Sequence, residues 1–216
     1  MGLSVVIITF NEEKNIGRCI SSVKNVADEI IVVDSLSTDG TVEICKAMGA
    51  GVHLQAFLGY VEQKNYALGL ASHDYVLSLD ADEALDPVLK KSILEVKKNF
   101  EHPAYLMNRC TNYCGKFIRH GAWYPDKKLR LVKKDLAYWG GDNPHDKLIM
   151  KDDSTPQHLA GDLLHYSYNS IEEHVAQNNK FSTISAETLF KRGTRTNIFK
   201  MIVHPSWAFV LGYFFR

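Results

Sequence analysis

Apolar runs and helix-periodic segments alternate along the N-terminal part of this chain. Residues 3–10 form an unbroken β-branched run, which is typical of a strand buried on both faces. Apolar residues then recur at helical spacing from Ile16 to Val23. Further strands are predicted at 29–34, 51–54 and 75–79, and further helices at 42–48, at 60–70 and from Pro87 onward. This regular succession indicates right-handed crossovers and a mainly parallel sheet, and therefore the α/β fold class.

The pattern changes in the second half of the chain. Residues 104–140 contain short β-like runs, aromatic residues and glycines without helical periodicity. We therefore expect antiparallel strands and loops that complete the sheet. Ser170 and Glu173 form a capping box, which predicts a long helix that ends near Arg192.

Residues 193–216 are expected to form a hydrophobic appendage to one compact domain of residues 1–192. The appendage is rich in aromatic residues but is interrupted by Lys200, His204 and Pro205. No stretch of the chain reaches the ~20 apolar residues of a membrane span. The pattern favours an interfacial or groove-docking helix, and packing on the chain's own core is an equal alternative. Because the chain ends within this aromatic segment, a longer natural polypeptide is expected.

Composition and charge exclude several classes of protein. Lysine plus arginine and aspartate plus glutamate both number 25, so no global field would attract nucleic acid. Cys110 and Cys114 have no second Cys/His pair at zinc-finger spacing, so the four cysteines are expected to be reduced thiols. Met1 leads directly into an apolar strand, so no signal peptide is expected. The predicted location is the cytoplasm, and peripheral contact with the cytoplasmic face of an inner membrane stays open.

Two carboxylates, Asp80 and Asp82, directly follow the apolar run 75–79. Residues i and i+2 of an extended chain point the same way, so these carboxylates would repel unless a cation lay between them. Mg²⁺ is commonly bound by one or two carboxylates plus substrate phosphates, so the pair predicts a metal site for a phosphorylated substrate. A turn that uses aspartate as a cap is the alternative.

Polar residues also follow the first and second predicted strands, as TFNEE at 9–13 and DSLSTDGT at 34–41. Ligands of open parallel sheets bind beyond the carboxyl ends of the strands, so these segments and the carboxylate pair are expected to meet. The chain contains neither G-x-G-x-x-G nor G-x-x-x-x-G-K-[ST], which argues against a dinucleotide site and a P-loop. Phosphates would therefore be held mainly by a metal and by side chains.

Four motifs occur in order along the chain: SVVIITFNEEKNI, EIIVVDSLSTDGT, QKNYAL and LSLDADE. Together they resemble the family 2 glycosyltransferases, which have the GT-A fold. Three later motifs, WYPDKKLRL, NPHDKL and LLHYSY, are similar to those of bacterial lipopolysaccharide-core β-glucosyltransferase-like members. The resemblance implies a nucleotide-sugar half at about residues 1–100 and an acceptor half at about 101–169.

The resemblance also implies roles for the residues at the strand ends. Asp34 would accept a hydrogen bond from the uracil ring, and Lys64 would approach the diphosphate. Asp80 would face the ribose, and Asp82 would bind the divalent metal, Mg²⁺ or Mn²⁺. His165 would be either a third metal ligand or a hydrogen-bonded structural histidine. The implied nucleotide-sugar set is Thr9, Phe10, Asn11, Glu12, Asp34, Ser35, Asp39, Lys64, Asp80 and Ala81, and the implied metal set is Asp82, Asp80 and His165.

Asp146 is implied as the catalytic base. In related inverting enzymes a carboxylate at a corresponding place takes the proton from the acceptor hydroxyl, and an ordinary aspartate is ionised at neutral pH. The pair His145-Asp146 is one methylene shorter than the His-Glu often found in this subfamily, so Glu83 and Asp142 remain alternatives.

Trp123 and Arg130 would contact the acceptor, because aromatic faces stack on sugars and arginine pairs with phosphate or carboxylate. Core packing for Trp123 and pairing with a local acid for Arg130 are the alternatives. The predicted function is inverting transfer of a sugar, glucose by the subfamily resemblance, from a UDP-sugar to a hydroxyl of lipopolysaccharide, capsule or another cell-envelope glycan. A polyprenyl-phosphate sugar synthase is the alternative enzyme, and a catalytically silent nucleotide-sugar-binding module is the non-enzymatic alternative.

Overall fold

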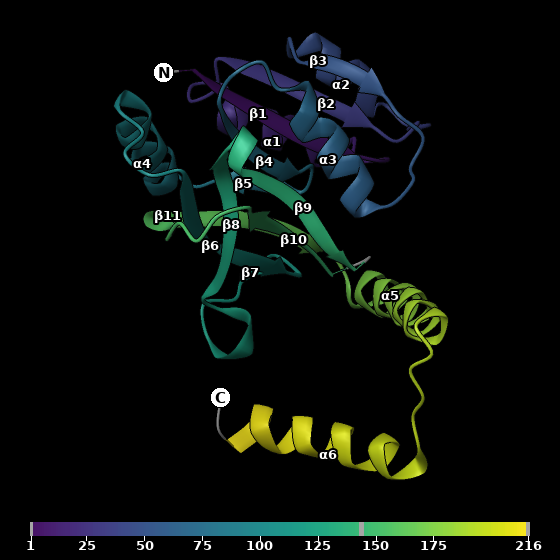
Figure 1. The fold of residues 1–216 in the computed structure, drawn as a ribbon. Helices are drawn as coiled ribbons and strands as arrows, with labels where there is room; N and C mark the ends of the chain where they lie inside the picture. Colours follow the sequence, from purple (N-terminus) through teal and green to yellow (C-terminus); the bar gives the residue numbers. More distant parts are fainter. Residues whose placement is uncertain (1, 143–144, 215–216) are drawn as a thin grey trace.

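One curved, mixed β-sheet forms the centre of the computed structural model, which describes residues 2–142 and 145–214 (Figure 1). Nine strands of the described chain run in the order β3-β2-β1-β4-β8-β6-β11-β5, with β7 paired to β6. These strands are β1 (Leu3–Thr9), β2 (Glu29–Asp34), β3 (Gly51–Leu54), β4 (Tyr75–Asp80), β5 (Glu83–Leu85), β6 (Ala104–Tyr113), β7 (Lys116–Phe117), β8 (Asp126–Lys133) and β11 (Gln157–Tyr168). The helices are α1 (Ile16–Val23), α2 (Thr41–Ala47), α3 (Tyr60–Leu70), α4 (Pro87–Lys98), α5 (Ile171–Lys191) and α6 (Ile198–Phe214).

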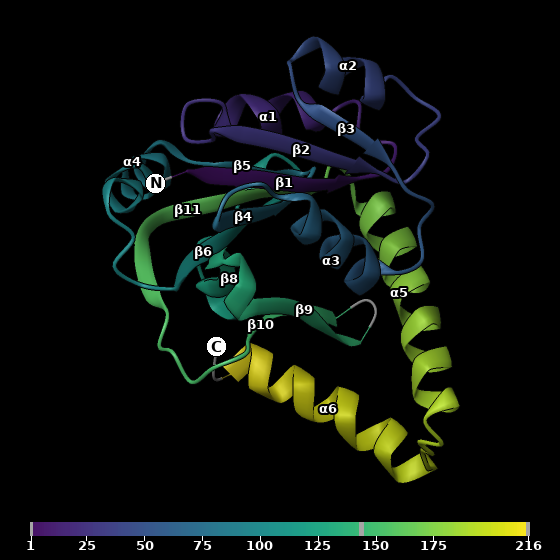
Figure 2. The ribbon, with the colours of Figure 1, turned by 45° about the horizontal axis from the view of Figure 1, so that its top comes forward.

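The N-terminal half is the predicted parallel sheet with helices on both faces. Strands β3, β2, β1 and β4 pair in parallel, which confirms the α/β prediction. Alternate residues of β1 belong to separate cores: Val5 and Ile7 join the cluster that includes α1 and α2, whereas Val6 joins the cluster that includes α3. Figure 2 shows α1 and α2 on one side of this half and α3 on the other. A strand covered on both faces must be apolar throughout, and β1 is.

Register in the parallel half brings the predicted polar segments to one edge. Thr9 of β1 is opposite Asp34 of β2, and Ile8 is opposite Asp80 of β4. The three strands therefore end at the same level, and the loops that follow them converge, as expected for an open parallel sheet.

The second half adds antiparallel pairs, as the sequence predicts. β8 pairs with β4 and β6, and β11 pairs with β6 in parallel and with β5 in an antiparallel manner. Opposite Tyr105 and Leu106, the register of β8 moves from Leu131 to Leu129, so Arg130 is the extra residue of a β-bulge. Bulges change the direction of a side chain, and this one lies beside the carboxylates of β4 and β5.

A separate hairpin, β9 (Ala137–Asp142) and β10 (His145–Met150), lies beside α3. Asn65 of α3 bonds both backbone polar groups of Trp139: its side-chain NH₂ donates to the carbonyl at 2.7 Å, and its Oδ1 accepts from the N–H at 2.9 Å. This double contact attaches the hairpin to the parallel half of the structure.

The predicted long helix after Ser170 is confirmed as α5, which ends at Lys191. The Ser170 hydroxyl accepts from the N–H of Glu173 at 3.2 Å, but the Glu173 carboxylate bonds the N–H of Asn169 rather than that of Ser170. α5 extends away from the sheet and α6 runs back at a distance from it, so the two helices form an arm that projects from the sheet (Figures 1 and 2).

α6 contains no buried residue, so the alternative that this segment packs on the chain's own core is wrong for its described residues. Its large apolar side chains are exposed, including Phe199 and Trp207. No helix within residues 2–142 and 145–214 combines the length and the apolar character needed to cross a membrane.

Gly161 of β11 permits the close approach of α4 to the sheet. Its φ of +98° lies in the left-handed region, and a Cβ there would lie 2.2 Å from the backbone nitrogen of Leu89. Gly161→Ala should therefore lower the free energy of unfolding by more than the ~1–3 kcal/mol typical of one strained backbone residue. Urea denaturation measures the change.

Gly69→Ala in α3 is the matched control, because in the described part of the chain no atom beyond its own stretch of helix lies within 4 Å of the added methyl group. A helical glycine replaced by alanine should gain about 0.5–1 kcal/mol of stability. Equal midpoints for the two variants would contradict the packing assigned to Gly161.

Candidate active site

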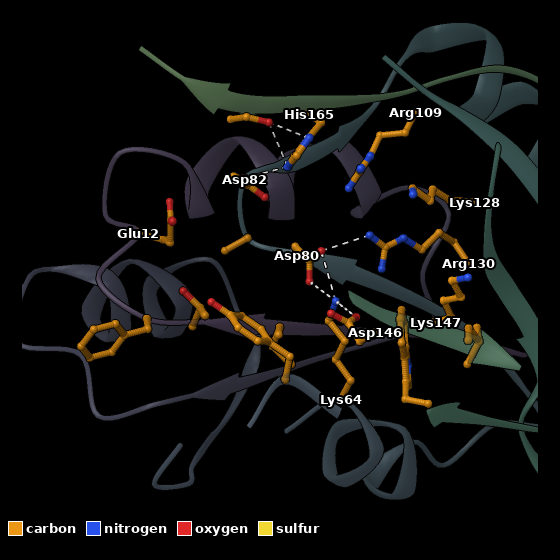
Figure 3. Close-up of a pocket in the computed structure, with 18 of the residues that line it drawn as sticks. Glu12, Lys64, Asp80, Asp82, Arg109, Lys128, Arg130, Asp146, Lys147 and His165 are labelled. Carbon is orange, nitrogen blue, oxygen red and sulfur yellow. Dashed lines mark hydrogen bonds and ion pairs between the residues drawn. The ribbon is translucent and has the colours of Figure 1, made fainter. Parts of the chain in front are cut away.

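A cavity of about 1130 Å³ opens where β1 and β4 end, between the parallel half and the hairpin (Figure 3). Most of the residues predicted from the sequence to act at the site line it. They are Thr9, Phe10, Glu12, Ser35, Lys64, Asp80, Ala81, Asp82, Arg130, Asp146 and His165. The structure thus collects residues from β1, α3, β4, β8, β10 and β11, and from the loops that follow β1, β2 and β4, around one space.

Asp80, the last residue of β4, is held between two cations. Lys64 Nζ lies 2.9 Å from its Oδ1, and Arg130 Nη2 lies 3.0 Å from its Oδ2. Burial alone would raise the pKa of Asp80, but the positive charges of Lys64 and Arg130 outweigh it, so the pKa lies well below its usual range. Asp80 is therefore ionised at neutral pH.

Arg130 and Glu83 form a buried ion pair beneath Asp80. Their side chains are 4% and 0% exposed, and Arg130 Nη2 lies 2.7 Å from Glu83 Oε1. Burial alone would lower the pKa of Arg130, but the negative charges of Glu83 and Asp80 outweigh it and raise the pKa above its usual value. Glu83 also accepts the N–H of Asp80 at 3.0 Å. Glu83 is thus a buried support for the end of β4, and it does not line the cavity.

Asp146 enters the cavity from the hairpin. Its Oδ2 lies 2.8 Å from Lys64 Nζ, and its side chain is 11% exposed. Lys64 therefore contacts the carboxylates of both Asp80 and Asp146, and its ammonium lies 4.4 Å from the ring centroid of Trp139. The two hydrogen bonds between Asn65 and Trp139 hold β9, and β9 pairs with β10, which carries Asp146. α3 therefore positions both Lys64 and the hairpin.

On the wall of the cavity opposite Asp146, Asp82 contacts His165. Asp82 Oδ2 lies 3.2 Å from His165 Nε2, and Ser167 Oγ lies 2.7 Å from His165 Nδ1. Burial would lower the pKa of His165, but the carboxylate of Asp82 outweighs it and raises the pKa. This contact agrees with both readings of His165, as a structural histidine and as a metal ligand.

The fit of a divalent cation can be judged from this pair. Two ligands at ~2.1 Å from one octahedral ion lie about 3 Å apart, which matches the separation of the Asp82 and His165 atoms. Within residues 2–142 and 145–214, no group of three or more His, Cys, Asp or Glu side chains could hold a metal by itself. The pair fits an ion whose remaining ligands come from a diphosphate and water, as is common for Mg²⁺.

Three predicted nucleotide residues do not line the cavity: Asn11, Asp34 and Asp39. Asp34 is fully buried, and both its oxygens are bonded by Ser37, through the backbone N–H at 2.8 Å and through the hydroxyl. Asn11 has a positive φ of 54° and its side chain accepts the N–H of Thr38 at 2.8 Å. These residues hold the loops after β1 and β2 together behind the cavity wall.

Asp39 completes this loop network. It accepts the N–H of Glu13 at 3.2 Å and the hydroxyl of Thr41 at 2.5 Å. The Thr41 hydroxyl also accepts the N–H of Glu12 at 2.8 Å. Burial is the main cause that raises the pKa of Glu12 to about 6, and the nearby Asp82 adds to it. Glu12 thus presents a carboxyl group that is close to half protonated in mildly acidic solution.

A scan against protein-family models matches residues 4–159 to Glycosyl transferase family 2. The chain belongs to this family. An uncharacterized glycosyltransferase of Rickettsia typhi is 35% identical over 99% of this chain and 77% of its own length. The lipopolysaccharide core biosynthesis glycosyltransferase LpsC of Rhizobium meliloti is 29% identical over 98% of this chain and 80% of its own length.

Solved structures agree on the fold. Glucosyl-3-phosphoglycerate synthase from Mycobacterium tuberculosis, solved with Mn²⁺, UDP and glucosyl-3-phosphoglycerate, has a TM-score of 0.57 and 20% identity over 91% of this chain and 81% of its own. Mannosyl-3-phosphoglycerate synthase from Rubrobacter xylanophilus has a TM-score of 0.55 and 15% identity over 92% of this chain and 77% of its own. The GT-A fold expected for a family 2 glycosyltransferase is confirmed.

The two residues predicted to contact the acceptor lie in different places. Arg130 forms part of the cavity wall, and its pairing with Glu83 and Asp80 is the local-acid alternative named from the sequence. Trp123 is 39% exposed and lines a smaller neighbouring cavity of about 350 Å³. Its ring meets that of Tyr168 edge-on at 6.4 Å. Their acceptor roles stay predictions.

Several residues that line the cavity were not predicted from the sequence. Arg109, Trp139 and Lys180 come from segments with no short motif of their own. The motifs WYPDKKLRL and NPHDKL contain Lys127, Lys128 and Lys147 and were a usable signal for these lysines. The residues missed are Arg109, Lys127, Lys128, Trp139, Lys147 and Lys180.

Proposed function

We propose that this family 2 glycosyltransferase transfers a sugar with inversion from a UDP-sugar to a hydroxyl group of a cell-envelope glycan. The observation that carries the proposal is the position of Lys64, whose Nζ lies within 3 Å of both Asp80 and Asp146. Asp80, which belongs to the carboxylate pair expected at the diphosphate, and Asp146, the carboxylate expected at the acceptor hydroxyl, thus share one cation. Donor and acceptor chemistry would meet at this point.

The donor would occupy the side of the cavity formed by the ends of β1 and β2. Thr9 and Ser35 line this side, and the Thr9 hydroxyl is buried with no partner among the described residues. A nucleoside would supply that missing hydrogen bond. A UDP donor is further supported by the related fold of the mycobacterial synthase solved with UDP and Mn²⁺. The donor sugar, glucose by resemblance, is part of the proposal.

Asp82 and His165 would hold the divalent cation, Mg²⁺ or Mn²⁺, on which this donor depends. When bound, the cation supplies positive charge that neutralises the leaving diphosphate. Lys64 would add a second positive charge from the wall that carries Asp80 and Asp146. Arg130 and Glu83 keep Asp80 in place while this charge is present.

Asp146 would act as the base. Its carboxylate takes the proton of the acceptor hydroxyl as that oxygen bonds to the anomeric carbon from the face opposite the diphosphate. The bond between the anomeric carbon and the diphosphate oxygen breaks, and UDP leaves with both electrons. One displacement inverts the configuration, and no covalent enzyme intermediate is required.

The acceptor class rests on the relative from Rhizobium meliloti, whose name assigns it to lipopolysaccharide core biosynthesis. A core, capsule or related envelope saccharide is proposed here by that similarity. In the alternative polyprenyl-phosphate sugar synthase the attacking group is already anionic, and no base is needed. The carboxylate of Asp146 inside the cavity favours a hydroxyl acceptor.

The role of Asp146 is tested by Asp146→Asn. This variant should bind UDP-glucose in calorimetry with nearly unchanged affinity, but its transfer rate to truncated lipopolysaccharide cores should fall by about 10²–10⁴-fold, the usual contribution of a general base. Asp142→Asn is the matched control in the same hairpin. Full turnover of Asp146→Asn, with a loss in Asp142→Asn instead, would move the base to Asp142.

The metal assignment is tested by Asp82→Ala. Transfer that depends on Mg²⁺ or Mn²⁺ should fall by at least about 100-fold, because even outer groups around a metal commonly contribute 10–100-fold. The thermal midpoint without ligand should stay close to that of the wild type, since the Asp82–His165 pair is partly exposed to solvent. Removal of the metal with a chelator should abolish transfer by the wild type. Metal-dependent transfer by Asp82→Ala at the wild-type rate would contradict the assignment of Asp82 to the metal. Binding of UDP-sugars without transfer across a panel of acceptors would identify a silent binding module.

α6 would place the enzyme at a lipid surface that carries its acceptor. The helix is apolar and exposed, and no acidic residue follows Glu187, whereas Lys191, Arg192, Arg195 and Lys200 are basic. An apolar helix with basic neighbours fits an anionic bilayer interface, because apolar burial and attraction to anionic lipids both favour binding there.

Ile202→Ser combined with Phe209→Ser tests this contact, because these residues are 65% and 64% exposed on α6. Sedimentation with phosphatidylglycerol-containing vesicles should weaken by at least about tenfold, as each large apolar side chain contributes roughly 1.5–3 kcal/mol on burial. Val88→Ser with Leu94→Ser on α4 is the control and should bind as the wild type does. Equal sedimentation of both double variants would contradict the proposal, as would a stable dimer formed through α6 in light scattering.

A further inference from the structure

Cationic side chains line the cavity, and Arg109, Lys128, Arg130 and Lys147 lie together on one wall of it (Figure 3). β8 supplies Lys127 and Lys128, β10 supplies Lys147, α5 supplies Lys180, and β6 supplies Arg109. The chain as a whole has a formal net charge of zero, so this concentration is local. Five cationic residues from four elements surround the same space, which no single run of basic residues along the chain would achieve.

This wall lies away from the side assigned to the donor. In Figure 3, Arg109, Lys128, Arg130 and Lys147 occupy the side opposite Glu12, with Lys64, Asp80 and Asp146 between them. A group bound at this wall would therefore be separated by Asp146 from the loops that follow β1 and β2, where the donor is proposed to bind. That is the position of the acceptor in the proposed function.

Acidic side chains of the protein neutralise only part of the wall. Asp126 pairs with Arg109 Nη2 at 2.9 Å and with Lys128 Nζ at 3.0 Å. Among the residues that the structure describes, no carboxylate pairs with Lys127, Lys147 or Lys180. Three lysines thus face or border the cavity with uncompensated charge.

Arg130 is a second and independent sign that a ligand is missing from this wall. It is 3% exposed and lines the cavity, and its Nε and Nη1 have no hydrogen-bond partner within the described part of the chain. A buried N–H without a partner costs free energy, so such groups are normally satisfied by protein, water or ligand. The lysines of the wall could simply be solvated surface residues. That explanation does not account for a buried arginine with two unpartnered nitrogens.

We propose that this wall, formed by Arg109, Lys127, Lys128, Arg130 and Lys147, binds an anionic group of the acceptor, a carboxylate or a phosphate, beside the hydroxyl that reacts. The inference rests on the proposed function for the identity of the acceptor side. Lysine meets such a group as a point charge, and arginine offers paired N–H donors. The wall would select acidic or phosphorylated saccharides over neutral ones, since a neutral sugar leaves the lysine charges unmatched.

Binding to the full chain saturated with Mg²⁺ and UDP tests the inference, because UDP blocks phosphate binding on the donor side. The probes are glucose, glucuronic acid and glucose 6-phosphate, which share a ring and differ in charge. Calorimetry should show at least tenfold tighter binding of one or both anionic sugars than of glucose. Their relative affinities distinguish a carboxylate site from a phosphate site. The preference should shrink between 50 and 300 mM salt, because charge pairing is screened.

Lys127→Gln combined with Lys147→Gln removes two exposed charges and should weaken binding of the anionic sugar by at least tenfold. Lys46→Gln combined with Lys91→Gln makes the same charge change on α2 and α4, away from the cavity, and should have no effect. Equal binding of all three probes, or equal effects of the two double variants, would overturn the inference. Failure of UDP to bind, together with intact charge-selective binding, would instead count against the proposed donor and leave the anion site standing.

Discussion

The site depends on a chain of buried and half-buried charges that joins the two halves of the domain. Arg130 in β8 pairs with Glu83 in β5 and with Asp80 in β4, and Lys64 in α3 continues the chain from Asp80 to Asp146 in β10. Two cations and three anions from five elements compensate one another where water has little access. Breaking a buried pair of this kind generally costs about 3–5 kcal/mol, because a charge is left without its partner. The position of each carboxylate is therefore tied to the fold.

The same interactions give the carboxylates of Asp80 and Asp82 different environments. Asp80 is occupied by Lys64 and Arg130, whereas Asp82 faces His165 at the opposite wall. Residues i and i+2 of an extended strand would point the same way, but β4 ends at Asp80 and a turn follows it. Asp82 therefore lies outside the cation network that Asp80 anchors, and it lines the cavity beside His165.

The sequence predicted the parallel half closely because its signals are local. Continuous apolar runs, helical spacing and the helix start at Pro87 are signals that fall within a few residues, and β2, β3 and α3 match the predicted bounds. Partner choice was beyond the sequence. Arg130 could equally have faced an acceptor or an acid, and only the bulge opposite Tyr105 and Leu106 turns its guanidinium toward Glu83. The bonds of Asp34 with Ser37 were likewise invisible in the pattern of residues.

By itself, the sequence determined the family, the α/β architecture and the set of chemical groups at the strand ends. These follow from periodicity and from ordered motifs, which act over short distances along the chain. Only the tertiary structure decided which groups meet: Lys64 with Asp146, Asp82 with His165, and the lysines of β8, β10 and α5 around one cavity. Such contacts join residues tens of positions apart, and they depend on strand register and on a bulge. Register is set by the packing of the whole sheet, so no local segment encodes it.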